Sequence, residues 1–177
     1  MTSPSHELAL GARLAAAGVP LGLPGALLAM VDELPADGGP RPCLRVLAPL
    51  GDGAALAAWC SAGGEAEPAV VRRVPLDERF VLVLDDGATR GAVLTWLREH
   101  YGHANLCARM LPMDQGVSWW CYALSTSWLE DLPHAPTEQE ALVRGAEWLA
   151  AGRWVTRTPQ APRPRVGGPP PRQRGQG

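Results

Sequence analysis

The chain contains no lysine and no isoleucine, and beside seven tryptophans it has only one phenylalanine and two tyrosines. All sixteen cationic side chains are therefore arginine. No fold requires this bias, and together with abundant alanine, glycine, proline and leucine it is typical of a protein from a GC-rich genome. Arginine content alone is consequently no argument for nucleic-acid binding.

Long apolar runs are also lacking. Nothing approaches the roughly 18 uninterrupted apolar residues that a membrane-spanning helix needs, and Pro20 and Pro24 interrupt the early apolar stretch. The N-terminus lacks the basic segment of a secretory signal peptide. The cysteines are too few and too scattered for a secreted disulfide scaffold. We therefore expect a cytoplasmic protein without membrane contact.

Catalytic motifs are the third absence. There is no G-x-S-x-G or other local nucleophile signature, and the residues from Gly87 to Gly91 match neither phosphate-binding glycine spacing. The acidic residues Asp77, Glu78, Asp85 and Asp86 suggest paired carboxylates, but at a strand end before a helix such residues are more often caps and solvated turn residues. The sequence therefore predicts no catalytic residue and no cofactor.

What the chain does contain is a regular pattern over residues 79–152. It predicts a strand at 80–84, a helix at 88–101, two strands within 105–124 and a helix at 137–151. Asp85 or Asp86 can cap the first helix, and Thr137 with Glu140 forms a capping box for the second. This β-α-β-β-α core predicts an α+β fold, with helices packed on one face of an antiparallel sheet.

The preceding residues, 3–75, are punctuated by glycine and proline. A helix is expected from Ser3 or Ser5 to Gly18. Apolar runs at 26–31 and 43–48 predict a hairpin, residues 52–59 a short helix, and residues 69–74 another strand. We expect residues 3–154 to form a single α+β domain.

The hairpin within 105–124 has a predicted register. If Leu111 pairs with Val117, Cys107 lies opposite Cys121, and Arg109 lies opposite Trp119. The face that should meet the core then carries Leu106, Ala108, Met110, Trp120, Tyr122 and Leu124.

The tryptophans suggest a contact surface. Trp96, Trp120 and Trp148 fit the predicted apolar faces, whereas Trp119 falls on the poorer face beside Arg109. Tryptophan and arginine dominate protein interfaces. The predicted binding residues are Trp119, Arg109, Trp128 and Trp154.

A metal site has weaker support. The nearest constellation combines His100, His103, Cys107 and Cys121, which a helix end, its loop and two strands could bring together as zinc requires. Their spacing matches no compact zinc motif, and His100 is favoured at a helix C-terminus by the dipole alone. A disulfide between Cys107 and Cys121 is geometrically allowed, although a reducing cytoplasm favours two thiols. We predict no metal here.

The last segment, residues 155–177, is rich in proline, glycine and arginine and is predicted to be disordered. It carries five cations and no acid, and since the whole chain carries −2, residues 1–154 carry −7. A basic tail can neutralise nucleic-acid phosphates, but it lacks the stacking aromatics of single-strand binders. The arginines concerned are Arg157, Arg163, Arg165, Arg172 and Arg174.

Four short segments carry a family resemblance. The stretch from Asp85 to Gly102 and the later Pro136-Thr-Glu-Gln-Glu-Ala-Leu142 resemble a D-P-A-T opening and a final T-E-x-E-A-L helix. Ala16-Ala-Gly-Val-Pro20 and Pro24-Gly-Ala-Leu27 match two further motifs. Over about half the chain the sequence resembles small α+β proteins encoded in phage and prophage genomes of GC-rich bacteria, although Gly87 stands where those often have proline. No activity is attached to that group, so the resemblance implies a setting and not a chemistry.

Three functional hypotheses follow. The first is a non-enzymatic accessory protein, phage- or mobile-element-like, that acts by binding another protein. The second is a nucleic-acid-binding protein that uses the arginine-rich tail. The third is a zinc-dependent enzyme or a zinc-stabilised domain.

Overall fold

A computed structural model describes residues 4–31, 41–60, 66–102, 106–113, 116–123 and 134–153. Within these residues the elements follow in this order: α1 (Pro4–Ala16), β1 (Leu27–Met30), β2 (Cys43–Leu50), β3 (Ala54–Cys60), β4 (Ala66–Pro75), β5 (Phe80–Leu82), α2 (Gly87–Tyr101), β6 (Leu106–Met113), β7 (Gly116–Ala123), β8 (His134–Ala135) and α3 (Glu138–Ala150).

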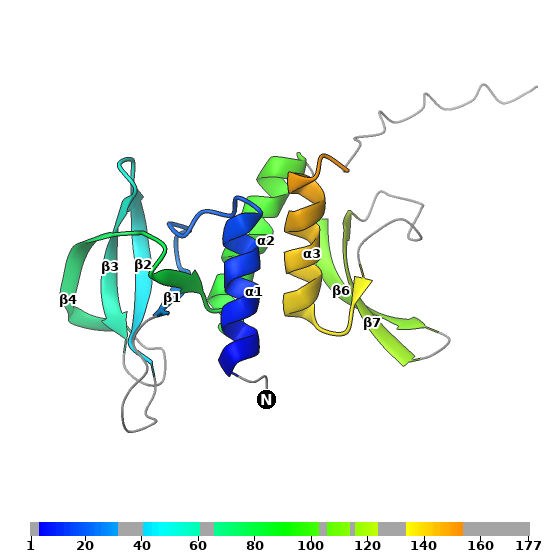
Figure 1. The fold of residues 1–177 in the computed structure, drawn as a ribbon, viewed down its shortest axis with the longest axis horizontal. Coiled ribbons are helices and arrows are strands. Elements are labelled where there is room, and N and C mark those ends of the chain that lie inside the picture. The colour runs from blue at the N-terminus through cyan, green and yellow to red at the C-terminus, as the bar shows by residue number, and fades with distance from the viewer. Residues whose placement is uncertain are drawn as a thin grey trace, which may run out of the picture.

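The described elements form two antiparallel sheets with helices between them (Figure 1). One sheet has the strand order β4-β3-β2-β1-β5, and the other has the order β6-β7-β8. The α+β class is thus confirmed, and the predicted order over residues 79–152 holds except that the short strand β8 precedes α3. The strands of that unit do not share one sheet, however, because β5 pairs with β1 while β6 and β7 pair with each other.

The N-terminal part largely follows the predicted pattern. Helix α1 ends just before Gly18, which adopts the left-handed φ of 84° that favours glycine. Strands β1 and β2 pair antiparallel, with Leu28 opposite Leu44, so the predicted hairpin is confirmed. Strand β4 includes the predicted strand at 69–74.

The helix predicted over residues 52–59 is wrong, because β3 occupies this segment. Its alanines favour a helix in isolation, but Gly53, with φ of 76°, helps to turn the chain back from β2. β3 then pairs with β2 on one side and β4 on the other. Small side chains are compatible with a central strand, so tertiary pairing overrides the local preference.

The second half of the chain has the predicted caps. Asp86 caps α2 by accepting a hydrogen bond from the Thr89 amide, and Gly102, with φ of 66°, ends the helix. Thr137 caps α3 by accepting a bond from the Glu140 amide, as the capping box predicts.

The register predicted for β6 and β7 is wrong by one residue. Pro112 lies opposite Val117, and the pairing continues to Met113 and Gly116. β6 is an edge strand, where a proline such as Pro112 can be accommodated without breaking a ladder hydrogen bond. A one-residue shift exchanges the two faces of β7 relative to β6.

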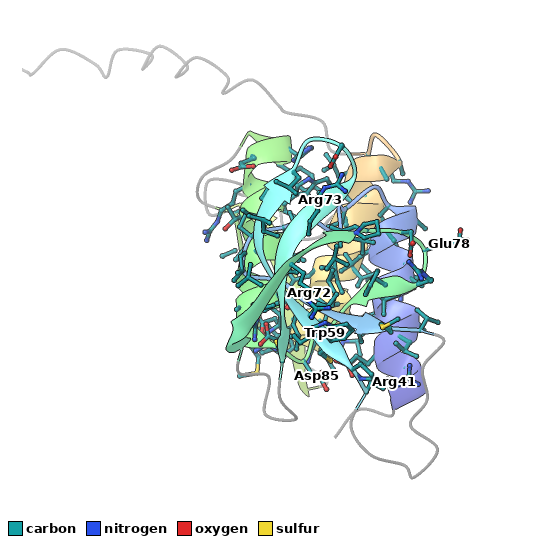
Figure 2. All side chains as sticks on the ribbon, turned by 90° about the vertical axis from the view of Figure 1, so that its left-hand side faces the viewer. Arg41, Trp59, Arg72, Arg73, Glu78 and Asp85 are labelled. Carbon is teal, nitrogen blue, oxygen red and sulfur yellow. The ribbon has the colours of Figure 1, made fainter. Side chains whose placement is uncertain are left out.

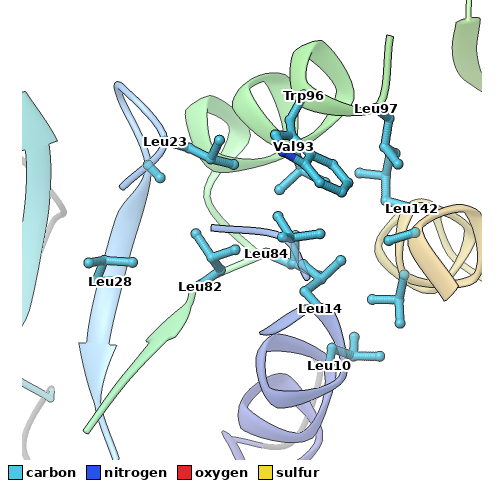
Figure 3. Close-up of a cluster of buried hydrophobic side chains, with 14 of the residues drawn as sticks. Leu10, Leu14, Leu23, Leu28, Leu82, Leu84, Val93, Trp96, Leu97 and Leu142 are labelled. Atoms are coloured by element: carbon cyan, nitrogen blue, oxygen red, sulfur yellow. The ribbon is translucent and has the colours of Figure 1, made fainter. Parts of the chain in front are cut away.

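The main core lies where the helices meet the five-stranded sheet (Figure 3). Leucines from α1, β1, β5 and α3 meet the buried face of α2, which carries Val93, Trp96 and Leu97. At one edge Gly11 of α1 lies directly against the backbone of β5. Helix α3 also packs on β7 and β8 of the three-stranded sheet. The outer side of β2–β4 points away from the helices (Figure 1).

Candidate contact surface

The strands β2, β3 and β4 carry several exposed apolar side chains, although Ala54 and Ala58, which alternate with Leu56 on the same face of β3, are buried. In β3, Ala55 and Ala57 are buried in the main core and Trp59 packs against it. Because side chains alternate along a strand, Leu56 points to the opposite face, and its side chain is 39% exposed.

Two further exposed apolar side chains adjoin Leu56. The register of β2 shifts between Val46 and Ala48, which makes Leu47 an extra residue beside Ala48, the residue opposite Leu56. On the other side Val71 lies opposite Ala58, one diagonal step from Leu56. Leu47 is 45% exposed and Val71 is 47% exposed. We call Leu47, Leu56 and Val71 the apolar patch.

The exposed apolar side chains of the described residues are clustered. Among the described residues, four large apolar side chains are exposed, and three of them form this patch. The fourth, Met110, is 52% exposed and belongs to the other sheet. Isolated exposed apolar residues are ordinary, whereas a contiguous group with a polar rim is typical of an interaction site.

The rim of the patch is charged. Arg73 lies opposite Leu56 on the same face and forms an ion pair with Asp52, in the turn between β2 and β3. The hydrogen bond from Arg73 holds the pKa of Asp52 below its usual range, so this carboxylate is ionised at neutral pH. Arg72 is exposed as well, but it pairs with Ala57, which is buried in the core, so it does not lie on the face of Leu56. Figure 2 shows both arginines on the part of the molecule that carries β2–β4.

A second polar group joins the five-stranded sheet to α2. Arg45 of β2 donates to both carboxylate oxygens of Asp86, at 2.8 and 3.1 Å. Asp86 also accepts from the Thr89 amide and hydroxyl, and that hydroxyl accepts from the Leu27 amide. Burial raises the pKa of Asp86, but the bonds from Arg45 and Thr89 outweigh it and keep this pKa below the usual value. These hydrogen bonds connect β1 and β2 to the start of α2, so the cluster of Arg45, Asp86 and Thr89 has a structural role.

The predicted pairing of Trp119 with Arg109 is wrong. Met110 lies opposite Trp119, and Trp120 lies opposite Arg109. Trp119 therefore shares the face of Leu106 and Ala108, and it packs partly against the core. The assignment of Trp120 to that face is wrong for the same reason. Trp119 and Arg109 are thus not a cross-strand pair, and their binding roles stay predictions.

The predictions for the other tryptophans have three different outcomes. Trp96 is buried in the core, as predicted, whereas Trp148 is only half-buried. Trp128 and Trp154 lie outside the described residues, as do the five tail arginines from Arg157 to Arg174. Their proposed binding roles stay predictions.

The predicted metal candidates are not brought together as expected. Cys107 lies opposite Tyr122, and Cys121 lies opposite Ala108, so the two thiols are not a cross-strand pair and the predicted disulfide geometry is wrong. His100 stacks on Trp96 at 4.0 Å between ring centroids, and its Nδ1 lies 2.9 Å from the Trp96 carbonyl. His103 lies outside the described residues. No group of three or more potential metal ligands occurs among the residues that the structure describes.

Sequence reasoning missed the apolar patch because it assigned residues 52–59 to a helix. In a helix, Leu56 would have shared a face with Asp52 and Trp59, at spacings of four and three. Residues 54–59 are apolar throughout, so no alternation of polar and apolar residues marked them as a strand.

Comparisons with known proteins give no relative: no family model, no curated protein and no solved structure matches the chain. Within the described residues, none of the helices is both long enough and apolar enough to cross a bilayer.

Proposed function

We propose that this chain is a non-enzymatic accessory protein that acts in the cytoplasm by binding another protein through the apolar patch on β2–β4. The phage-like setting implied by the sequence resemblance is part of the same proposal. The observation that carries it is the gathering of the exposed side chains Leu47, Leu56 and Val71 on neighbouring positions of β2, β3 and β4.

The balanced charges around the patch favour a protein partner whose surface combines apolar and charged side chains. Arg73 and Asp52 neutralise each other at the rim, so apolar contact supplies the attraction and the rim supplies orientation. Interfaces of this kind have an apolar centre that excludes water and a polar border. Burial of the three side chains would contribute roughly 25 cal/mol for each Å² removed from water.

The test is a comparison of two matched variants. Leu56→Asp places a carboxylate directly opposite Arg73, where an opposite charge is tolerated by the strand pair. Met110→Asp makes the same change at an exposed apolar position of the other sheet. Each tagged protein is used to recover partners from a lysate of the encoding organism, and affinity is then measured with the purified partner.

We expect Leu56→Asp to weaken binding at least about ten-fold, as loss of a central contact does, while Met110→Asp leaves it unchanged. Thermal unfolding of both variants checks that they remain folded. Equal affinity of Leu56→Asp and the unaltered protein would overturn the proposal.

A further inference from the structure

Two cysteines that are distant in the sequence lie directly opposite each other in the sheet. Cys43 is the first residue of β2 and Cys60 is the last residue of β3, and the register pairs them. They lie at the open end of this hairpin, whereas Gly53 lies at its turn. Neither the spacing in the sequence nor any motif indicated this pair.

The backbone geometry suits a disulfide. Opposite residues of an antiparallel pair have Cα atoms about 4.5–5.5 Å apart, and their side chains lie on one face. A disulfide needs Cα atoms about 4.4–6.8 Å apart. No backbone movement is therefore required to join the two sulfurs.

Both thiols are partly accessible and free. Each is half-buried and reduced in the structure. The Cys43 Sγ lies 3.4 Å from the Arg41 carbonyl oxygen, and the Cys60 Sγ lies 3.8 Å from the Ala58 carbonyl oxygen. Rotation about the Cα–Cβ bonds exchanges these weak contacts for a bond between the sulfurs.

The two thiols differ in their electrostatic surroundings. Burial raises the pKa of both. At Cys60 the Arg45 guanidinium opposes this rise, through its charge and a hydrogen bond to the sulfur. At Cys43 the neighbouring Cys60 and Glu7 raise the pKa further, ahead of the opposing effect of the arginines. Both thiols are thus mostly protonated at neutral pH, and Arg45, one diagonal step from Cys60 in the register, partly offsets the effect of burial at Cys60.

We propose that Cys43 and Cys60 are a peroxide-sensitive dithiol, in which Cys60 attacks the oxidant and Cys43 resolves the product as a cross-strand disulfide. The Cys60 thiolate attacks one peroxide oxygen and breaks the O–O bond, which gives a sulfenic acid and hydroxide. The Cys43 thiolate then attacks the sulfenic sulfur and displaces hydroxide. Two thiols and one hydrogen peroxide become one disulfide and two waters.

The bond would close the open end of the β2–β3 hairpin, distant from the turn at Gly53. This inference does not depend on the proposed partner binding.

The first experiment uses the unaltered chain. The protein is treated with hydrogen peroxide, free thiols are alkylated, and it is digested with trypsin without reduction. Trypsin cleaves after Arg45 but not between Arg41 and Pro42, so Cys43 and Cys60 fall on the separate peptides 14–45 and 46–72. We expect these two peptides to be recovered as one linked species, lighter than their sum by two hydrogens and separated by reductant.

The second experiment assigns the roles. In Cys43→Ser the sulfenic acid on Cys60 cannot be resolved, so a sulfenic-acid reagent such as dimedone should label Cys60. In Cys60→Ser the label on Cys43 should be much weaker. Cys107→Ser is the control, because Cys107 lies opposite Tyr122 in the other sheet, and it should form the linked species like the unaltered protein. Absence of the linked peptides from the oxidised unaltered protein would overturn the proposal, and stronger labelling of Cys43 than of Cys60 would overturn the assigned order.

Discussion

At the scale of single residues, Asp86 connects three elements of the fold. It caps α2, pairs with Arg45 of β2, and through Thr89 reaches the backbone of β1. A cap at Asp85 or Asp86 was predictable from its place before a helix. The role of Arg45 was not, because its contact with Asp86 spans 41 residues and depends on the sheet register.

Replacing Asp86 with alanine removes the cap and leaves Arg45 without this carboxylate. Loss of a cap costs about 0.5–2 kcal/mol, and loss of a charged hydrogen-bond partner adds to it, so we expect the free energy of unfolding to fall by about 2–3 kcal/mol. The matched control is Asp85→Ala, whose exposed carboxylate accepts from Gln139 and should cost about 0.5 kcal/mol or less. Urea unfolding measures both, and equal losses would contradict the role assigned to Asp86.

At the scale of elements, the helices were easier to predict than the strand pairings. Caps and apolar stripes are local, so α2 and α3 could be recognised from residues within a few positions of one another. The register of β6 and β7 depends instead on how an edge strand accommodates Pro112, and β3 depends on two partner strands. Both errors arose where non-local pairing outweighs local preference.

The packing of α1 on β5 gives a prediction with an internal control. A Cβ at Gly11 would lie 2.6 Å from the Leu82 carbonyl oxygen and 3.0 Å from the Val81 Cβ, whereas a Cβ at Gly91 of α2 would meet nothing within 4 Å. Gly11→Ala should therefore lower the free energy of unfolding by about 1–3 kcal/mol. Gly91→Ala should raise it by up to about 1 kcal/mol, since alanine favours the helix. Stabilisation by both changes would show that α1 does not approach β5 so closely.

At the scale of the whole molecule, Arg13 fastens α1 to α3. Its guanidinium lies 3.0 Å from Glu140 and 2.7 Å from Glu147, and the two helices run side by side in Figure 1. Burial raises the pKa of Glu140, but the bonds from Arg13 and Arg144 outweigh it and lower the pKa below its usual 4.5. The class of fold was predictable from the order of elements, but the contact between the first and last helices was not, because nothing local encodes it.

This contact predicts a loss of stability in acid. A carboxylate whose pKa is lowered by folding stabilises the fold fully above its unfolded pKa, and this contribution disappears as the pH falls through the folded pKa. The advantage of the unaltered protein over Glu140→Gln should therefore be constant above about pH 5 and shrink below pH 4.5. Glu7 acts in the opposite sense, because burial and the nearby Asp85 raise its pKa. Unfolding of both proteins at pH 7 and pH 3 measures the effect, and an unchanged difference would contradict it.

Hydrogen–deuterium exchange of the chain, free and bound to the partner recovered with it, tests the proposed surface most directly. Binding through the apolar patch predicts slower exchange in peptides that cover β2–β4, above all around Leu56 and Val71. Peptides that cover β6 and β7 should exchange at the same rate in both states. Protection confined to β6 and β7, with β2–β4 unchanged, would contradict the account.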